Sequence, residues 1–173
     1  PNIRAMPADG TWNVYLSGEI HSDWRERIAD GIRGAGLDVS LMAPVTDHSA
    51  SDDVGVDVLG PEQSGFWKDH KGAGVNAVRT QTLLRKADVV VVRFGDKYRQ
   101  WNAAFEAGYA AALGKPIVTL HDADLTHALK EVDRAGMATA EAQQSKQLSI
   151  ATGGTGGVYY VLGGGFGSIL GKA

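Results

Sequence analysis

The sequence predicts a doubly wound α/β domain built on a parallel sheet. Strand-like and helix-like segments alternate along the chain, as crossover connections between parallel strands require. Residues 89–92 are four consecutive valines, a β-branched run typical of a strand that is buried on both faces of such a sheet. The chain has 173 residues, 43% of them hydrophobic, which is enough for one domain with a complete core. We therefore expect a flavodoxin-like or Rossmann-like sheet.

Strands and helices follow from local patterns. We expect strands at residues 13–17, 39–42, 89–92 and 117–120. We expect helices from residue 22 or 23 to residue 35 and over residues 75–86, 101–113 and 125–132, with a helical turn at residues 66–71. In the first helix Trp24, Ile28 and Ile32 form one apolar stripe, Ser22 or Asp23 can cap the start, and Gly36 closes the end.

The remaining segments divide the chain into three parts. Residues 1–11 read as a leader, residues 12–140 as the domain, and residues 141–173 as a glycine-rich tail with one possible strand at 148–152. Residues 45–61 are rich in Asp, Ser, Gly and Pro, so we expect a long polar loop of the kind that often serves as a lid.

Composition excludes several classes of protein. The formal net charge is −3 and no basic stripe is visible, so we expect no nucleic-acid partner. The chain has no cysteine, which rules out disulfides and thiolate zinc sites. The longest apolar run, at residues 87–94, is too short to span a bilayer, and residues 1–4 lack the apolar core of a signal peptide. We expect a cytoplasmic protein without a membrane partner.

Polar side chains follow every predicted strand. In open α/β sheets, ligands bind outside the carboxyl ends of the strands. The residues that the four strands deliver to this edge are Gly18, Glu19 and His21, then Asp47 and His48, then Gly95 and Asp96, and finally His121. Loops are polar in any case, so only the convergence of all four strand ends indicates a site.

Glu106 is the main candidate for chemistry. It falls in the second turn of the helix expected after the valine strand, among small side chains that would let a ligand approach. A carboxylate there can act as a nucleophile at the anomeric carbon of a sugar. Alternatively, Glu106 is an ordinary helix carboxylate near the positive end of the helix dipole. The residues alone do not separate these two interpretations.

The segment around Glu106 resembles a known signature. Residues 105–110 and 114–116, Phe-Glu-Ala-Gly-Tyr-Ala and Gly-Lys-Pro, are similar to the signature of the nucleoside 2-deoxyribosyltransferase superfamily, whose glutamate is the nucleophile. Residues 12–139 resemble the YtoQ family of that superfamily more closely. The segments that carry this resemblance are residues 14–21, 23–25, 44–48, 66–71, 87–98, 100–109 and 120–122.

The resemblance implies a fold of the nucleoside deoxyribosyltransferase type and roles for individual residues. Glu106 would attack C1′ of a nucleoside or nucleotide, and Asp96 or Asp47 would be the acid–base partner. Tyr15, Gly18 and Asn102 would shape the sugar site. The other expected substrate-binding residues are Glu19, His21, His48, Gly95, Trp101 and His121. We expect a homo-oligomer and neither a cofactor nor a metal.

The sequence also departs from the signature of the superfamily. Gln100 and Asn102 replace residues of the usual Asp-x-Gly or Ser-x-Gly opening, and Arg79 and Thr80 are the nearest equivalents of a substrate-binding aspartate. The first alternative is therefore a non-catalytic module that binds a nucleotide or sugar phosphate. A metal-assisted hydrolase that uses the histidines is a further alternative.

The tail carries a second resemblance. Residues 147–171 are similar to the start of mature TAXI-type solute receptors of tripartite transporters. We interpret the tail as a graft or chimera that is joined within residues 137–147. So few residues cannot form a receptor domain, so we assign no transport function to them.

Overall fold

The computed structural model describes residues 10–97 and 100–142. Its four strands form one parallel sheet in the order β2-β1-β3-β4. The strands are β1 (Trp12–Gly18), β2 (Val39–Met42), β3 (Val89–Arg93) and β4 (Ile117–Leu120). The predicted α/β class with a parallel sheet is thus confirmed. Most of the expected leader, almost the whole tail and the strand expected at 148–152 lie outside the described residues.

Helices connect the strands, and some of them differ from the prediction. They are α1 (Trp24–Ala35), α2 (His48–Asp52), α3 (Val54–Leu59), α4 (Gly65–Lys86), α5 (Trp101–Ala112), the short 3₁₀ helix η1 (Ala123–Leu125) and α6 (Lys130–Ala142). The turn at 66–71 and the helix at 75–86 are one continuous helix. In place of a helix at 125–132, the chain forms η1 and then α6.

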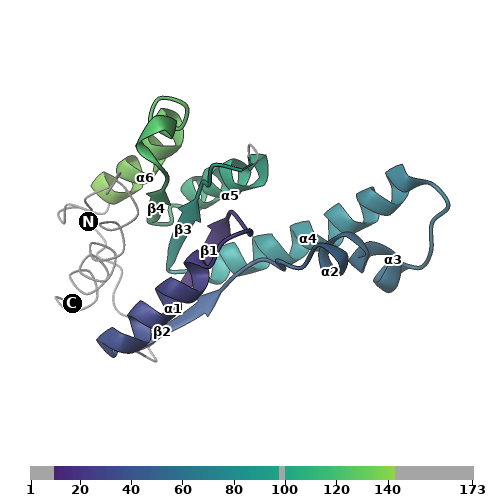
Figure 1. Cartoon of the computed structure of the whole chain (residues 1–173), viewed down its shortest axis with the longest axis horizontal. Coiled ribbons are helices and arrows are strands. Elements are labelled where there is room, and N and C mark those ends of the chain that lie inside the picture. The colour runs from purple at the N-terminus through teal and green to yellow at the C-terminus, as the bar shows by residue number, and fades with distance from the viewer. Residues whose placement is uncertain (1–9, 98–99, 143–173) are drawn as a thin grey trace.

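The prediction of a long polar loop at residues 45–61 is wrong, because most of this segment is helical. The Asp47 carboxylate caps α2 by accepting a hydrogen bond from the Ala50 amide at 2.8 Å. Helix α3 packs closely on α4, since a Cβ atom at Gly55 would lie only 2.2 Å from the Gly72 nitrogen. Figure 1 shows α2, α3 and the first half of α4 extending away from the sheet as an arm.

The two faces of the sheet bury different side chains. Successive residues of a strand point to opposite faces. Val14 and Leu16 of β1 pack with the buried stripe of α1, whereas Tyr15 packs with α4 and α5. The valines of β3 divide in the same way, and all four are at most 4% exposed. The sequence-based prediction that this strand is buried on both faces is confirmed.

The chain reverses its direction of winding at β1. From β1, helix α1 leads outward to β2, and α4 then returns across to β3 on the other side of β1. The carboxyl ends of β1 and β3 therefore flank the switch point, where ligands bind in folds of this class. The Glu19 amide donates to the Arg93 carbonyl at 3.0 Å and joins the two strand ends.

Only the carboxyl end of α1 is formed as the sequence predicts. Gly36 is left-handed, with φ of 63°, and its amide donates to the carbonyls of Ile32 and Arg33. At the other end, Asp23 occupies the N-cap position but makes no side-chain cap hydrogen bond. Ser22 donates its hydroxyl to Glu19 instead, at 2.6 Å. The predicted side-chain cap is wrong because the loop after β1 uses this hydroxyl.

Lys115, in the Gly-Lys-Pro segment, is buried and has a structural role. Its Nζ donates to the Arg85 carbonyl at 2.8 Å and to the Ala87 carbonyl at 2.6 Å, which closes the carboxyl end of α4. Hydrogen bonds from a charged group contribute about 1.5–3 kcal/mol each. With two such bonds lost, Lys115→Met should lower the free energy of unfolding by about 3 kcal/mol or more, as measured by urea denaturation.

The control for this prediction is Lys86→Met at the end of the same helix. Lys86 is exposed, so this variant should change the stability by less than about 0.5 kcal/mol. Equal losses in the two variants would show that Lys115 does not hold the end of α4.

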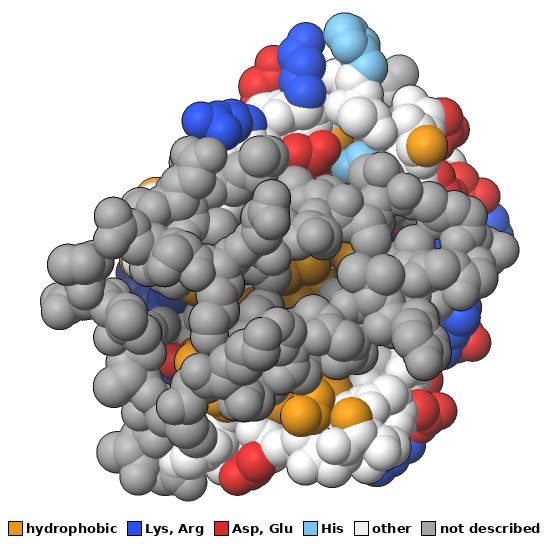
Figure 2. Space-filling model, turned by 90° about the vertical axis from the view of Figure 1, so that its left-hand side faces the viewer, with side chains coloured by type: hydrophobic (Ala, Val, Ile, Leu, Met, Phe, Trp, Pro, Cys, Tyr) orange, Lys and Arg blue, Asp and Glu red, His pale blue; other side chains and the backbone are white. Residues whose placement is uncertain are grey.

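Charges of both signs lie on the face of the molecule that Figure 2 shows. Figure 2 shows basic and acidic side chains side by side around the margin of one face. This face therefore presents no single-sign field across its described part. None of the helices within residues 10–97 and 100–142 is long and apolar enough to cross a membrane.

Candidate functional site

Glu106 lies on the face of α5 that packs against the sheet. The other buried residues of α5 are Ala103, Ala107 and Ala110, so the carboxylate interrupts a stripe of small apolar side chains. Only 9% of Glu106 is exposed. Glutamate is rarely buried without partners, because removing its charge from water costs free energy. Its surroundings must therefore compensate the charge.

Ser17 is the direct partner of Glu106. Its hydroxyl donates to Oε2 of Glu106 at 2.5 Å, and both side chains are buried. Ser17 stands two residues after Tyr15 on β1, so both side chains face the α5 side of the sheet. Ser17 was not among the site residues expected from sequence, although the strand alternation that places Tyr15 on this face also places Ser17 there.

Tyr15 lies beside Glu106 with its hydroxyl fully buried. The hydroxyl makes no hydrogen bond of normal geometry with any described residue, although Thr80 of α4 and Glu106 are its neighbours. Burial raises the pKa of Tyr15 and the Glu106 charge raises it further, so the phenol stays protonated. Tyr15 therefore presents an O–H donor next to the carboxylate.

Burial also raises the pKa of Glu106 above its ordinary value. Hydrogen bonding from Ser17, the neighbouring Tyr15 hydroxyl and the charge of Arg25 act in the opposite direction. The carboxylate is thus a stronger base than an exposed glutamate, but it is held by donors that favour its charged form.

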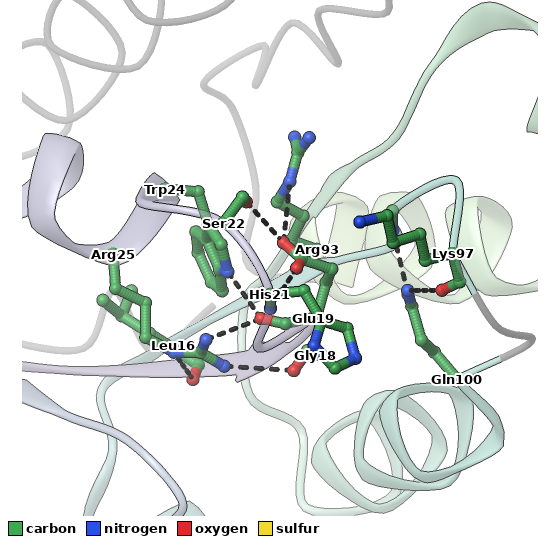
Figure 3. A network of polar contacts seen from close by, with 11 residues as sticks. Leu16, Gly18, Glu19, His21, Ser22, Trp24, Arg25, Arg93, Lys97 and Gln100 are labelled. Atoms are coloured by element: carbon green, nitrogen blue, oxygen red, sulfur yellow. Dashed lines mark hydrogen bonds and ion pairs between the residues drawn. The ribbon is translucent and has the colours of Figure 1, made fainter. Parts of the chain in front are cut away.

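The loop after β1 is fixed by Arg25. Its guanidinium donates to three backbone carbonyls, those of Leu16 at 3.3 Å, Gly18 at 3.1 Å and Glu19 at 2.6 Å. It also lies over the Trp24 ring, 4.5 Å from the centroid. Figure 3 shows these contacts around the end of β1. Arg25 therefore holds the strand end that carries Ser17.

Glu19 is oriented by its own loop. Its carboxylate accepts from the His21 amide and from the Ser22 hydroxyl, and Arg93 Nε lies 3.7 Å from Oε2 (Figure 3). Burial by itself would raise the pKa of Glu19, but these hydrogen bonds and the Arg93 charge bring it below its ordinary value. The carboxylate is therefore ionised and stabilises the loop.

The loop after β3 is organised by Gln100. Gln100 has a left-handed backbone, with φ of 46°. Its side chain accepts from the Gly95 amide at 2.8 Å and donates to the Lys97 carbonyl at 2.7 Å (Figure 3). These bonds place Gly95 and Asp96 directly before the start of α5. Asp96 is exposed, and Gln100, one of the departures from the superfamily signature, shapes the loop.

Asp47 and the two histidines of this edge have different surroundings. Hydrogen bonds from the Ser49 hydroxyl and the Ala50 amide lower the pKa of Asp47, which is fully exposed. The rings of His21 and His48 lie next to each other, with centroids 6.1 Å apart, although they follow different strands. The expected convergence of strand ends thus brings these two histidines together.

The remaining candidate residues lie on α5 and β4. Trp101 and Asn102 are exposed in the first turn of α5, and Phe105, which the sequence analysis did not single out, is 65% exposed one turn later. His121 is buried, and its Nε2 lies 3.1 Å from Asp133 Oδ2 on α6. The Asp133 carboxylate also accepts from Thr119 at 2.7 Å. The His121 side chain is thus held by its contact with Asp133 of α6.

The described residues contain no group of three or more His, Asp or Glu side chains that could hold a metal ion. Glu106, Ser17 and Tyr15 form the compact group at the centre of this edge.

Two comparisons with known proteins cover this site. A family model described as nucleoside 2-deoxyribosyltransferase YtoQ matches residues 15–151. The chain belongs to this family. It is also 41% identical over 138 residues to the protein named "Uncharacterized protein YtoQ" of Bacillus subtilis (strain 168), which covers 79% of this chain and 93% of that relative. The match includes Tyr15, Ser17 and Glu106. The resemblance of residues 12–139 to the YtoQ family is thus confirmed.

Proposed function

We propose that the protein breaks the N-glycosidic bond of a nucleoside or nucleotide, or transfers its deoxyribosyl group, through Glu106. The observation that carries this proposal is the buried Glu106 carboxylate, which Ser17 hydrogen-bonds at the carboxyl edge of the sheet. The family to which the chain belongs is described as nucleoside 2-deoxyribosyltransferase, which supports this chemistry.

In the proposed reaction, one oxygen of ionised Glu106 forms a bond with C1′ of the sugar. The C1′–N bond breaks, its electron pair leaves with the base, and the base takes up a proton from an acid. The resulting glycosyl ester is then attacked at C1′ by water or by a second base, whose proton returns to the deprotonated acid, and the C1′–O bond to Glu106 breaks and frees the carboxylate. A negative side chain stabilises the oxocarbenium-like transition states of both steps.

Asp96 is the preferred acid–base partner in this scheme. It is exposed in the loop that leads directly into α5, close in sequence to the start of the helix that carries Glu106. Asp47, the other candidate, accepts two hydrogen bonds from the start of α2 that lower its pKa, so it stays ionised and carries no proton to give to the leaving base. We therefore assign proton transfer to Asp96.

The substrate would enter at the edge formed by the first loop and the start of α5. Gly18 and Asn102 would contact the sugar, and buried Tyr15 would shape the sugar site through Glu106. Exposed Trp101 would stack on the base, since base–aromatic stacking contributes about 1–3 kcal/mol. The histidine pair lies on the β2 side of the same edge.

We also propose that the protein acts as a homo-oligomer in the cytoplasm. Support for the oligomer comes from large hydrophobic side chains that are more than half exposed on α3, α4 and α5. They are Val58, Leu59, Phe66, Trp67, Val78, Trp101 and Phe105.

The proposed function predicts turnover of a small set of compounds. Ribonucleosides, deoxyribonucleosides, their 5′-monophosphates and ribose phosphates should be screened by thermal shift, and each stabilising compound incubated with the protein. Chromatography should then detect a free base, or an exchanged base when a second base is added. Binding without base release over hours would favour the alternative, a non-catalytic nucleotide-binding module.

A further inference from the structure

The described residues contain one hydrogen bond between a serine hydroxyl and the proposed nucleophile. Ser17 is 0% exposed and Glu106 is 9% exposed, and the bond joins residues 89 positions apart in the sequence. A serine hydroxyl has a single proton to donate. Because this proton is directed at Oε2 of Glu106, the bond distinguishes the two oxygens of the carboxylate.

We propose that Ser17 is a positioning residue that holds Oε2 of Glu106 and thereby leaves Oε1 as the oxygen that attacks C1′. This inference rests on the proposed function and adds the device that orients its nucleophile. A carboxylate on a helix can rotate about its terminal side-chain bond, so an unheld Glu106 would sample several orientations. One short hydrogen bond from a rigid strand removes this freedom before the substrate binds.

The backbone around Ser17 is well suited to this role. Ser17 pairs with Val92 in the interior of the sheet, between β1 and β3. The following strand end is held by Arg25, whose guanidinium donates to the carbonyls of Leu16, Gly18 and Glu19. The hydroxyl is therefore carried by a segment that is fixed on both sides.

The other groups around Glu106 do not replace Ser17. Among the described residues, no hydrogen bond of normal geometry reaches Oε1. Tyr15 from β1 and the positive charge of Arg25 from α1 are the titratable groups that act on Glu106, and both favour its charged form. Neither forms a hydrogen bond of normal geometry with Glu106, so neither fixes one carboxylate oxygen. The orientation thus depends on Ser17.

The test compares wild type with Ser17→Ala, Ser17→Cys and Ser17→Thr. We expect Ser17→Ala to lower kcat by about 10- to 100-fold with little change in KM, because the nucleophile is misplaced while binding is kept. Ser17→Cys is close in size and a weak donor, so it should behave like the alanine variant. Ser17→Thr keeps the hydroxyl and should recover most of kcat. If threonine does not fit the buried site, the alanine and cysteine variants still test the positioning role of Ser17.

The pH dependence of the rate separates a positioning role of Ser17 from a merely structural one, because a structural role would leave the pKa of Glu106 unchanged. Glu106 attacks in its ionised form, so the rate rises with pH through the pKa of Glu106. Loss of the Ser17 donor removes a bond that favours the charged form, and the acidic limb of the profile should therefore move to higher pH in Ser17→Ala. Carbon-13 NMR titration of the Glu106 carboxyl should show the same shift without any substrate.

The matched control is Thr119→Val, which also removes a buried strand hydroxyl. Thr119 donates to Asp133 on α6 and has no hydrogen bond with Glu106. This variant should lose stability but keep the titration of Glu106.

An unchanged Glu106 titration in Ser17→Ala would overturn the proposal. If Ser17→Ala shifts the titration while the wild type releases no base from any compound, the proposed function fails but the hydrogen bond is established. If base release needs Glu106 but Ser17→Ala keeps the wild-type kcat, only the positioning role fails.

Discussion

Glu106→Gln should abolish base release and leave nucleotide binding largely intact. The glutamine keeps the shape of the side chain but cannot form the glycosyl ester, so kcat should fall by at least about 10³-fold. Binding should change little, because the charge of the carboxylate matters most where positive charge develops in the transition state. Base release should be followed by chromatography and binding by calorimetry with the compound found in the screen.

Glu106→Gln should also change how the stability of the protein depends on pH. Burial raises the pKa of Glu106 in the folded protein, so its protonated form is favoured by folding. The stability that this contributes is present at low pH and is lost as the pH rises through the folded pKa. Relative to wild type, Glu106→Gln should therefore become more stable as the pH increases. This difference is measured by urea denaturation at several pH values.

Two outcomes would contradict this prediction. Glu106→Gln with wild-type base release would remove Glu106 from the chemistry. A strong loss of stability in Glu106→Gln at neutral pH would show that the carboxylate is mainly a structural group. Glu106→Ala serves as the control for packing, since it removes the side chain as well as the charge and should lose stability through the space left behind.

The four strands and the position of Glu106 could be predicted from sequence because their signals are local. The valines at residues 89–92 specify a strand that is buried on both faces, and the structure bears this out. Gly36 ends α1 as expected, because a left-handed residue there favours glycine. The helix that carries Glu106 ends within one residue of its predicted limit.

The arm could not be predicted because its helices depend on distant contacts. Helices α2 and α3 have five and six residues, too few to be stable by themselves. They are held by α4, where Gly55 lies against Gly72 and Asn76 donates to the Ser51 carbonyl at 2.9 Å. The Asp, Ser, Gly and Pro residues of this segment favour turns, and its few apolar residues show no helical period that would outweigh them.

The arrangement of the candidate site could be predicted only in part, because some of its contacts also depend on residues far apart in the sequence. Strand order explains why His21 and His48 meet, and alternation along β1 explains why Tyr15 faces Glu106. Ser17 was missed because its partner lies 89 residues away and a serine at a strand end has no distinctive signal. His121 follows a strand like the other candidates, but its pairing with Asp133 depends on α6, which begins nine residues later.

Gly18→Ala should be the most destabilising single substitution at the edge of the sheet. Gly18 has a φ of 105°, a conformation that residues with a Cβ atom rarely adopt. A Cβ atom here would lie 2.0 Å from the Arg93 carbonyl oxygen, which also accepts the hydrogen bond from the Glu19 amide. Strain and clash together should lower the free energy of unfolding by at least about 3 kcal/mol in urea denaturation.

Gly31→Ala is the matched control, because it adds the same methyl group elsewhere. Gly31 lies within α1, and a Cβ atom there would meet no atom within 4 Å. This variant should gain roughly 0.5–1 kcal/mol, since alanine favours the helix. If Gly18→Ala is instead as stable as wild type, the end of β1 can shift away from Arg93. Because Ser17 directly precedes Gly18, such freedom would also contradict a rigid Ser17–Glu106 bond.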